Sequence, residues 1–151
     1  MRAAWVGLAV VAADQATKWW VLERLAPGES VAVVPGFVYL TRIHNPGAAF
    51  GFFTHQPALL SGVALFLLWL AWRNRQFIRR QPVGARIGIA LGLGGASGNL
   101  IDRLFRGAVV DFIDPLIWPV FNLADACIVS GAAILSWFIV FRRGGAGVQD
   151  A

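Results

Sequence analysis

GGASGNLIDRLFRGAVVDFIDPLIWPVFNLAD, residues 94–125, is the most informative stretch of this 151-residue chain. It holds four of the eight acidic residues, namely Asp102, Asp111, Asp114 and Asp125, between and at the ends of strongly apolar runs. Ionisable groups at membrane depth are costly, so they are candidates for a functional site by default. Several carboxylates brought together suggest acid–base chemistry, metal binding or proton transport.

The composition around this stretch is that of an integral membrane protein. Hydrophobic residues make up 58% of the chain and charged residues 14%, whereas soluble domains have about 45–50% and about 25%. The net charge is +5, but the basic residues lie between apolar runs, which argues against a nucleic-acid partner. The single cysteine, Cys127, excludes an internal disulfide and any multi-cysteine metal site.

The apolar runs predict an all-α polytopic membrane protein that forms a single domain over residues 1–151. Four transmembrane helices are expected at about 3–24, 57–74, 85–105 and 119–141. Gly88, Gly92, Gly95 and Gly98 suit close helix packing in the third. The first run could instead be a cleavable signal peptide. Ser30–Val34 and Phe37–Ile43 have β-like composition, so we expect a small extracytoplasmic β-cradle between the first and second helices.

The basic residues predict the orientation of these helices. Eight of the thirteen fall at the two termini or in the connection between the second and third apolar runs: Arg2, Arg73, Arg75, Arg79, Arg80, Arg86, Arg142 and Arg143. By the positive-inside rule both termini are cytoplasmic. Every acidic residue except Asp150 then falls in the outer half, so the polar residues of the helices gather near the outer face.

Polar side chains also fall in pairs at helical spacing, which places each pair on one helix face. The pairs are Asp14 with Lys18, Asn99 with Asp102, and Asn122 with Asp125. Each of these polar residues also has an interpretation that needs no functional role. Asp14 and Lys18 could be a structural ion pair between helices, Asp102 could pair with Arg103 at the surface, and Asn45 and Gly47 could be turn residues only.

Two neighbouring carboxylates support one specific chemistry. They share a proton, the pKa of one rises, and the pair can take a proton from water and give one to a leaving group. No zinc-binding pattern of histidines and cysteines is present, and we expect no metal and no cofactor.

Four short sequence motifs, taken in chain order, resemble those of a known family. They are Asp14–Trp19 (DQATKW), Asn45–Phe50 (NPGAAF), Gly94–Asp114 and Phe121–Asp125 (FNLAD), and they span most of the chain. In these strings the chain resembles the lipoprotein signal peptidases, the type II signal peptidases of bacteria. The resemblance implies a membrane-embedded aspartyl endopeptidase that removes the signal peptide of diacylglyceryl-modified prolipoproteins, cleaving just before the lipidated cysteine.

The resemblance also assigns roles that composition cannot. It implies that Asp111 and Asp125 form the catalytic dyad. Residues at other motif positions would bind substrate or support the site: Asp14, Lys18, Asn45, Gly47, Asn99, Asp102, Arg103 and Asn122. The expected partners are a lipid-modified prolipoprotein and membrane lipid. The expected location is the bacterial cytoplasmic (inner) membrane, with the active site near its outer face.

Two other functions fit parts of the pattern. A small proton-coupled transporter could use Asp14, Lys18 and Asp125, although the polar residues gather at one face. A metal-dependent membrane phosphotransferase could use Gly107, Asp111 and Asp114, although the further upstream aspartates that such enzymes need are missing.

Overall fold

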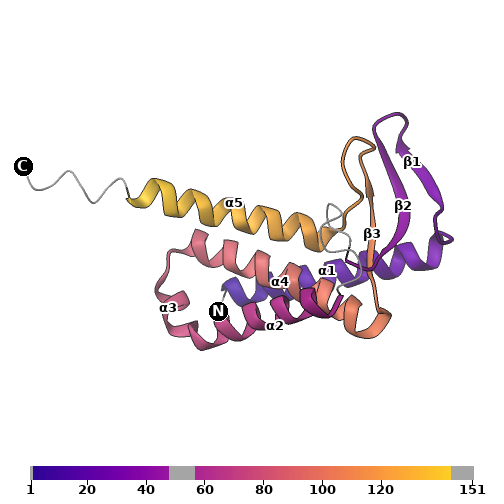
Figure 1. Cartoon of the computed structure of the whole chain (residues 1–151). Helices are drawn as coiled ribbons and strands as arrows, with labels where there is room; N and C mark the ends of the chain where they lie inside the picture. The colour runs from indigo at the N-terminus through magenta and orange to yellow at the C-terminus, as the bar shows by residue number, and fades with distance from the viewer. Residues whose placement is uncertain (1, 48–56, 144–151) are drawn as a thin grey trace, which may run out of the picture.

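The computed structural model describes residues 2–47 and 57–143. Four long helices run side by side: α1 (Arg2–Arg24), α2 (Pro57–Arg73), α4 (Val83–Arg106) and α5 (Leu123–Arg143). The short helix α3 (Arg75–Arg80) joins α2 to α4. Helix α4 is central, because α1, α2 and α5 all pack against it (Figure 1).

The start of α5 differs from the expectation. The fourth apolar run was expected to be helical from about residue 119, but the helix begins at Leu123. The backbone of Phe121 instead exchanges hydrogen bonds with Ile113, at 3.0 and 2.8 Å. These hydrogen bonds hold the residues before Leu123 in an extended conformation, so the helix does not begin earlier.

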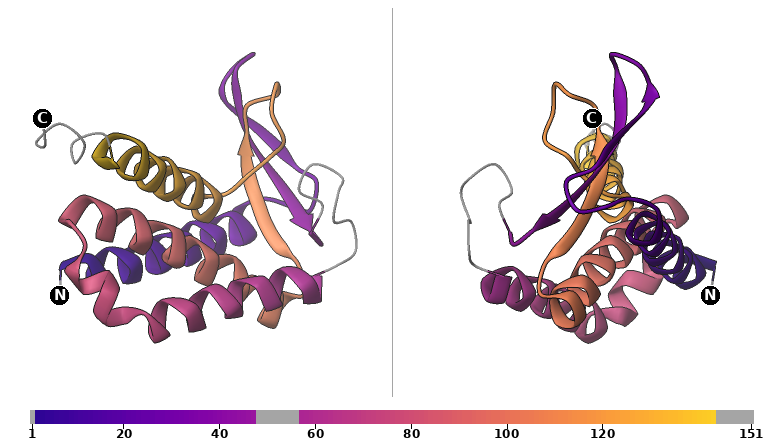
Figure 2. Two further views of the ribbon diagram at one scale, coloured as in Figure 1. Left: turned by 60° about the vertical axis from the view of Figure 1, so that its left-hand side comes forward. Right: turned by 90° about the vertical axis from the view of Figure 1, so that its right-hand side faces the viewer.

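A three-stranded antiparallel sheet stands across one end of the helices (Figure 2). Strands β1 (Ser30–Val34) and β2 (Val38–Asn45) form the expected hairpin, which turns at Gly36 with a φ of +81°. The third strand, β3 (Val109–Asp114), lies between α4 and α5 in the chain and pairs with β2. The expectation of a helical chain with a β-cradle between the first two helices is therefore confirmed in part, because the hairpin lies there but the third strand comes from the connection between α4 and α5.

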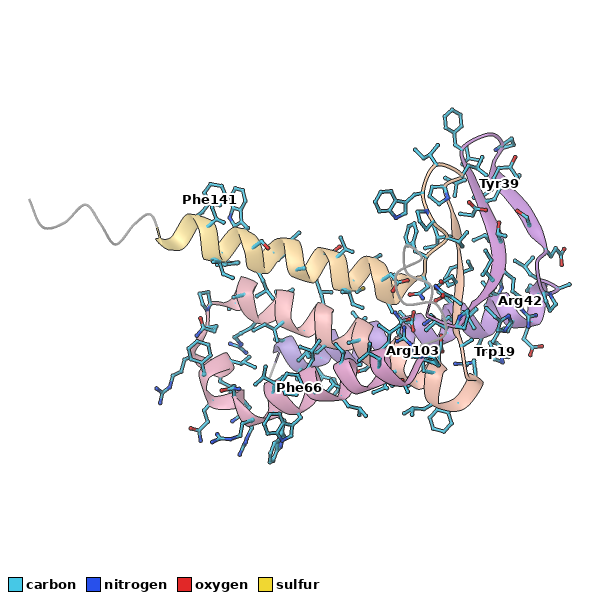
Figure 3. The ribbon with its side chains drawn as sticks, viewed as in Figure 1. Trp19, Tyr39, Arg42, Phe66, Arg103 and Phe141 are labelled. Atoms are coloured by element: carbon cyan, nitrogen blue, oxygen red, sulfur yellow. The ribbon has the colours of Figure 1, made fainter. Side chains whose placement is uncertain are left out.

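Large apolar side chains cover the outside of the helices. Trp5, Leu59, Phe66, Trp69 and Trp137 are all exposed, and Phe66 and Phe141 can be seen pointing away from the bundle in Figure 3. Within the described residues, α5 is long and apolar enough to cross a membrane over Leu123–Phe141, and α2 is a shorter apolar helix. An exposed surface of this kind is suited to lipid rather than water.

Small residues bring α4 close to α5. A Cβ atom on Gly95 would overlap the carbonyl oxygen of Ala124 and lie 2.8 Å from Cγ1 of Ile128. A Cβ on Gly131 would lie 2.5 Å from the carbonyl oxygen of Gly88. Gly92 differs from its neighbours, since a Cβ there would meet nothing within 4 Å. Close packing at Gly95 sets the first turn of α5 directly against the C-terminal half of α4.

Candidate active site

A buried ion cluster joins α1 to α4 below the sheet. The ammonium of Lys18 lies 2.9 Å from a carboxylate oxygen of Asp14 and 2.8 Å from one of Asp102, and it donates a hydrogen bond to Oδ1 of Asn99 at 2.9 Å. The side chains of Lys18, Asp14 and Asp102 are fully buried. The ion pair expected from the spacing of Asp14 and Lys18 is confirmed, and Asp102 belongs to the same cluster.

Two further side chains complete the cluster, and sequence reasoning missed both. Gln15 donates to Oδ1 of Asp102 at 3.1 Å, and Arg106 makes an ion pair with the same oxygen. Two cations, Lys18 and Arg106, therefore balance the two carboxylates. The surface pair with Arg103 was the wrong interpretation of Asp102. Arg106 follows Asp102 by four residues, so helical spacing could have indicated it.

The backbone is tied to the same two carboxylates. Asp14 accepts a hydrogen bond from the N–H of Ala124 at 3.0 Å, at the start of α5. Asp102 accepts one from the N–H of Val110 at 3.1 Å, in β3. The cluster therefore holds four segments of the chain together, because α1 and α4 supply its charges and α5 and β3 supply N–H donors.

Two asparagines connect this cluster to Asp111 and Asp125. Asn99 receives the Lys18 hydrogen bond on its oxygen and donates from its nitrogen to Oδ1 of Asp125 at 2.7 Å. Asn122 donates to Oδ1 of Asp111 at 2.7 Å and to Oδ1 of Asn99 at 3.1 Å. Both asparagines are buried. Asp111 and Asp125 are thus held in one hydrogen-bonded network.

Asn122 and Asp125 meet in a way that the spacing alone did not predict. Asn122 precedes α5, so the two residues do not share a helix face. Instead, Oδ1 of Asn122 accepts from the N–H of Asp125 at 2.9 Å, and Oδ2 of Asp125 accepts from the N–H of Asn122 at 3.3 Å. This reciprocal pair is a capping box, which fixes the first turn of the helix.

Strand pairing holds Asp111 from the other side. In the β2–β3 register, Asp111 is opposite Ile43 and Val109 is opposite Asn45. Nδ2 of Asn45 donates to Oδ2 of Asp111 at 2.8 Å, and Oδ1 of Asn45 accepts from the N–H of Gly47 at 2.9 Å. Gly47 has a φ of +118°, a conformation that favours glycine. Asn45 and Gly47 therefore form a turn that also orients Asp111.

Asp111 sits in an unfavourable place for a negative charge. Burial is the largest effect and raises the pKa of Asp111 to about 6, and the nearby Asp125 charge adds to the increase. Hydrogen bonds from Asn45 and Asn122 act in the opposite direction, but burial prevails. Asp111 can therefore hold a proton near neutral pH beside a second carboxyl group.

Both aspartates line a cavity of about 600 Å³. The polar lining includes Asn45, Asn99, Arg103, Asp111 and Asp125, and the apolar lining includes Trp118, Val120, Ile128 and Val129. Asn99, Arg103 and Asp125 also line an apolar groove of about 420 Å³ that runs between α2, α4 and α5. The cavity is thus open to an apolar path along the helices.

Arg103 has capacity left for a ligand. Its guanidinium interacts electrostatically with Asp125 and Asp111. Within the described residues, its buried Nε atom has no hydrogen-bond partner. A buried unpaired donor is costly, so a polar group of a ligand in the cavity would find a partner here.

The arrangement does not favour a metal site at Asp111 and Asp114. Residues three apart on a strand point to opposite faces, and Asp114 accepts instead from Thr41 at 2.7 Å and from the N–H of Leu116 at 3.0 Å. The described residues contain no group of three or more His, Cys, Asp or Glu side chains placed to bind a metal. The phosphotransferase interpretation therefore finds no support in this geometry.

Comparison with known proteins identifies the family. The sequence profile of signal peptidase (SPase) II matches residues 6–141. This chain belongs to the signal peptidase II family. The lipoprotein signal peptidase of Moorella thermoacetica is 42% identical over 142 residues, which cover 94% of this chain and 95% of that protein. The one from Pelotomaculum thermopropionicum is 48% identical over 132 residues, covering 87% of this chain and 86% of that protein.

Solved structures agree with this membership. A bacterial membrane enzyme solved by the in meso method at 2.3 Å has a TM-score of 0.85 and 28% identity, and the match covers 99% of this chain and 93% of that one. A second, at 1.9 Å, has a TM-score of 0.82 and 29% identity, with 93% of each chain covered. This signal peptidase II family member is accordingly a bacterial membrane protein and a peptidase.

All the residues expected at the site of this signal peptidase II family member lie together. Nine of them form one hydrogen-bonded and ion-paired network, and Arg103 lines the cavity beside it. The network extends from the Lys18 cluster, through Asn99 and Asn122, to the two aspartates.

Proposed function

We propose that this protein is an aspartyl endopeptidase that removes the signal peptide from diacylglyceryl-modified bacterial prolipoproteins, cleaving just before the lipidated cysteine. One observation carries the proposal. Asp111 and Asp125 line the same cavity and are joined by the side chain and backbone of Asn122, so they are positioned to act as a pair on one water molecule.

The two aspartates would divide the chemistry according to their surroundings. Asp111, with its raised pKa, supplies a proton to the scissile carbonyl oxygen. Asp125 accepts hydrogen bonds from Asn99 and from the N–H of Asn122 at the positive end of α5, and these donors stabilise its negative charge. Asp125 is therefore the base that takes a proton from the attacking water.

The second step would restore the pair. The proton on Asp125 passes to the leaving amine nitrogen as the C–N bond breaks. A hydroxyl of the tetrahedral intermediate returns its proton to Asp111 as the new carboxylic acid forms. No covalent intermediate is needed, and the dyad ends with the single shared proton with which it began.

The cavity suits a substrate that arrives through the bilayer. Its apolar wall and the groove between α2, α4 and α5 can take a signal-peptide helix and lipid tails. Arg103 supports binding, because its buried Nε is placed to donate to a backbone carbonyl or a lipid phosphate. Asn45 and Gly47 would line the approach to Asp111.

The residues at the two ends of the helix bundle support a specific orientation in the membrane. The four long helices would cross the bacterial cytoplasmic membrane as one domain, with both termini in the cytoplasm. The sheet and the two aspartates would then lie near the outer face, where water can reach the scissile bond. The arginine-rich connection through α3 would lie on the inner side.

A pair of conservative variants tests the dyad. Asp111→Asn and Asp125→Asn each keep the side-chain shape but remove the carboxyl group. Each should lower cleavage of a purified diacylglyceryl-prolipoprotein by at least about 10²-fold in the presence of a chelator. The matched control is Asp114→Asn, because Asp114 lies on the same strand but bonds to Thr41 and Leu116 outside the cavity. Full activity in either dyad variant would refute the assignment.

A further inference from the structure

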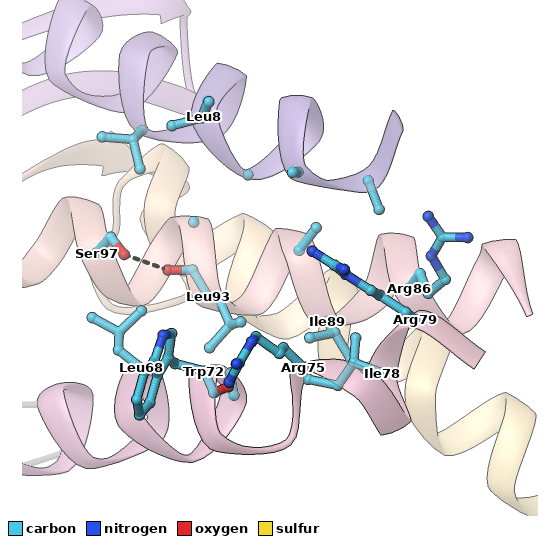
Figure 4. A pocket seen from close by; sticks show the side chains of 17 residues that line it. Leu8, Leu68, Trp72, Arg75, Ile78, Arg79, Arg86, Ile89, Leu93 and Ser97 are labelled. Carbon is cyan, nitrogen blue, oxygen red and sulfur yellow. Dashed lines mark hydrogen bonds between the residues drawn. The ribbon is translucent and has the colours of Figure 1, made fainter. Parts of the chain in front are cut away.

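A second cavity lies near the other end of the helices, and the proposed reaction does not use it. It has a volume of about 980 Å³ and lies between α1, α2 and α4 (Figure 4). Helices α1 and α2 each pack against α4 but scarcely against each other. The space between them is therefore a groove with α4 as its floor.

The interior of this groove is apolar. Its walls include Leu8 and Val11 from α1, Leu68 from α2, and Ile89 and Leu93 from α4. The hydroxyl of the one serine in the lining, Ser97, donates to the carbonyl oxygen of Leu93 at 2.8 Å (Figure 4). A ligand lying along the groove would therefore be a hydrocarbon rather than a polar chain.

One end of the groove carries positive charge. Arg75, Arg79 and Arg86 line it there, and every ion pair among the described residues involves Lys18 or Arg106 instead. Arg75 lies over the ring of Trp72, 5.1 Å from the ring centroid, and donates to its carbonyl oxygen at 3.1 Å. The three guanidinium groups thus line the groove without a carboxylate partner in the part of the chain that the structure describes.

The start of α4 adds to this positive potential. The helix is 24 residues long and has no acidic residue in its first turn, so its N-terminal dipole is not offset. Arg86 lies in that turn region. On α4, Arg86 and Ser97 are eleven residues apart, which corresponds to about 16 Å of groove at about 1.5 Å per residue.

We propose that this groove binds an anionic glycerophospholipid. The lipid phosphate contacts Arg79 and Arg86, and one acyl chain lies along the apolar floor toward Ser97. Arginine side chains suit phosphate because they donate two hydrogen bonds in the plane of the guanidinium. Basic pockets between transmembrane helices take such headgroups. Only a molecule with both a negative headgroup and a hydrocarbon chain satisfies both parts of the groove.

Native mass spectrometry of the full-length protein in detergent micelles tests this. Phosphatidylglycerol and phosphatidylcholine with identical acyl chains are titrated in parallel, and phosphatidylglycerol is expected to bind more tightly. The double variant Arg79→Gln/Arg86→Gln should weaken phosphatidylglycerol binding by about 25-fold, about fivefold for each arginine. The matched control is Arg73→Gln/Arg80→Gln, which removes the same charge from neighbouring positions that do not line the groove.

Each contrary outcome is distinct. Equal binding of the two lipids, or an equal loss in both double variants, would refute a specific site. Glycerol 3-phosphate binding as tightly as the lipid would indicate a phosphate site without a role for the groove. A dimer free of bound lipid would show that a second copy fills the groove. If the double variant does not fold, Arg79→Gln alone, at an exposed position, should still show the fivefold loss.

Discussion

Asp111 shows how its surroundings decide what a carboxyl group can do. Asp102 and Asp111 lie nine residues apart, but Asp102 is matched by Lys18 and Arg106, whereas Asp111 is held by the neutral amides of Asn45 and Asn122. Amide donors stabilise a carboxylate less than cations do, so burial raises the pKa of Asp111. The site therefore contains one paired acid and one acid that can exchange its proton.

Asn45→Ala is expected to change the pH dependence of cleavage. The hydrogen bond from Asn45 favours the charged form of Asp111 and lowers its pKa, so its loss should raise that pKa further above about 6. If protonated Asp111 is the acid, activity falls as the pH rises through its pKa. The high-pH limb of the kcat/KM profile should therefore move to higher pH.

Thr41→Ala is the control for this shift. Thr41 lies on the same strand but donates to Asp114, at 2.7 Å, so it should leave the limb where it is. A limb that stays in place in Asn45→Ala, or moves to lower pH, would show that Asp111 does not supply the proton.

Lys18→Met should destabilise the protein strongly. Lys18 is buried between Asp14 and Asp102, so its loss leaves a buried negative charge without a partner. Breaking such a pair costs about 3–5 kcal/mol of the free energy of unfolding. Thermal unfolding in detergent measures the loss, and exposed Arg24→Met should change stability by less than about 0.5 kcal/mol.

A double variant separates charge from packing. If the cost in Lys18→Met arises from unpaired charge, adding Asp14→Asn should recover part of it, because the asparagine oxygen can still accept from the N–H of Ala124. No recovery would mean that the aliphatic stem of Lys18, rather than its charge, carries the stability.

Residue types and helical spacing predicted much of this site, but not how its parts are connected. The Asp14–Lys18 pair follows from a spacing of four, and the candidacy of Asp125, which is half-buried, follows from its apolar neighbours. The Asp102–Lys18 pair lies 84 residues apart in sequence, and no local pattern indicates it. The choice of Asp111 over Asp102 and Asp114 came from family resemblance, because that choice depends on which carboxylate receives the cations.

At the scale of single elements, prediction succeeded where local composition and turn residues mark an element and failed where contacts within the folded chain decide it. The hairpin of β1 and β2 was recognised from its β-like composition and its Pro-Gly turn. Strand β3 was missed because Val109–Phe112 are all buried, so the alternation typical of a strand is absent. The start of α5 was misplaced because Phe121 pairs with Ile113, a contact that only the folded sheet provides.

Gly95 lies where α4 and α5 approach closely enough to exclude a side chain. A methyl group at Gly95 would overlap the carbonyl oxygen of Ala124 and force α5 away from α4. Gly95→Ala should therefore cost about 1–3 kcal/mol of the free energy of unfolding and, because Asp125 is adjacent to Ala124, should also lower activity. Both can be measured on the same purified protein.

Gly92→Ala is the matched control for stability on the same helix. A methyl group there meets nothing within 4 Å, so the better helix propensity of alanine should raise the free energy of unfolding by about 0.5–1 kcal/mol. Equal destabilisation by the two substitutions would show that the glycines matter for flexibility rather than for close packing.

The whole molecule is polarised along its helices. The sheet lies at one end of the helices and the connection from α2 to α4 through α3 lies at the other (Figures 1 and 2). The buried ion pairs and the two aspartates lie toward the sheet, and the arginines of α3 lie in the connection. In the proposed orientation, one end would carry the water-dependent chemistry and the charge of the other would hold it on the cytoplasmic side. The polarity depends on where charged residues stand along the whole chain. Because those positions can be read directly, the sequence predicts the polarity well.

Cysteine labelling tests the orientation that this polarity implies. In a Cys127→Ala background, Phe37→Cys places a thiol at the exposed turn of the hairpin, and Gln76→Cys places one on the exposed surface of α3. Short loops rich in arginine stay in the cytoplasm. A membrane-impermeant maleimide that can reach the outer face of the cytoplasmic membrane should therefore label Phe37→Cys in intact cells. It should label Gln76→Cys only after lysis. Labelling of both before lysis, or the reverse pattern, would overturn the orientation and move the aspartates to the inner face, where a secreted precursor could not be cleaved after its export.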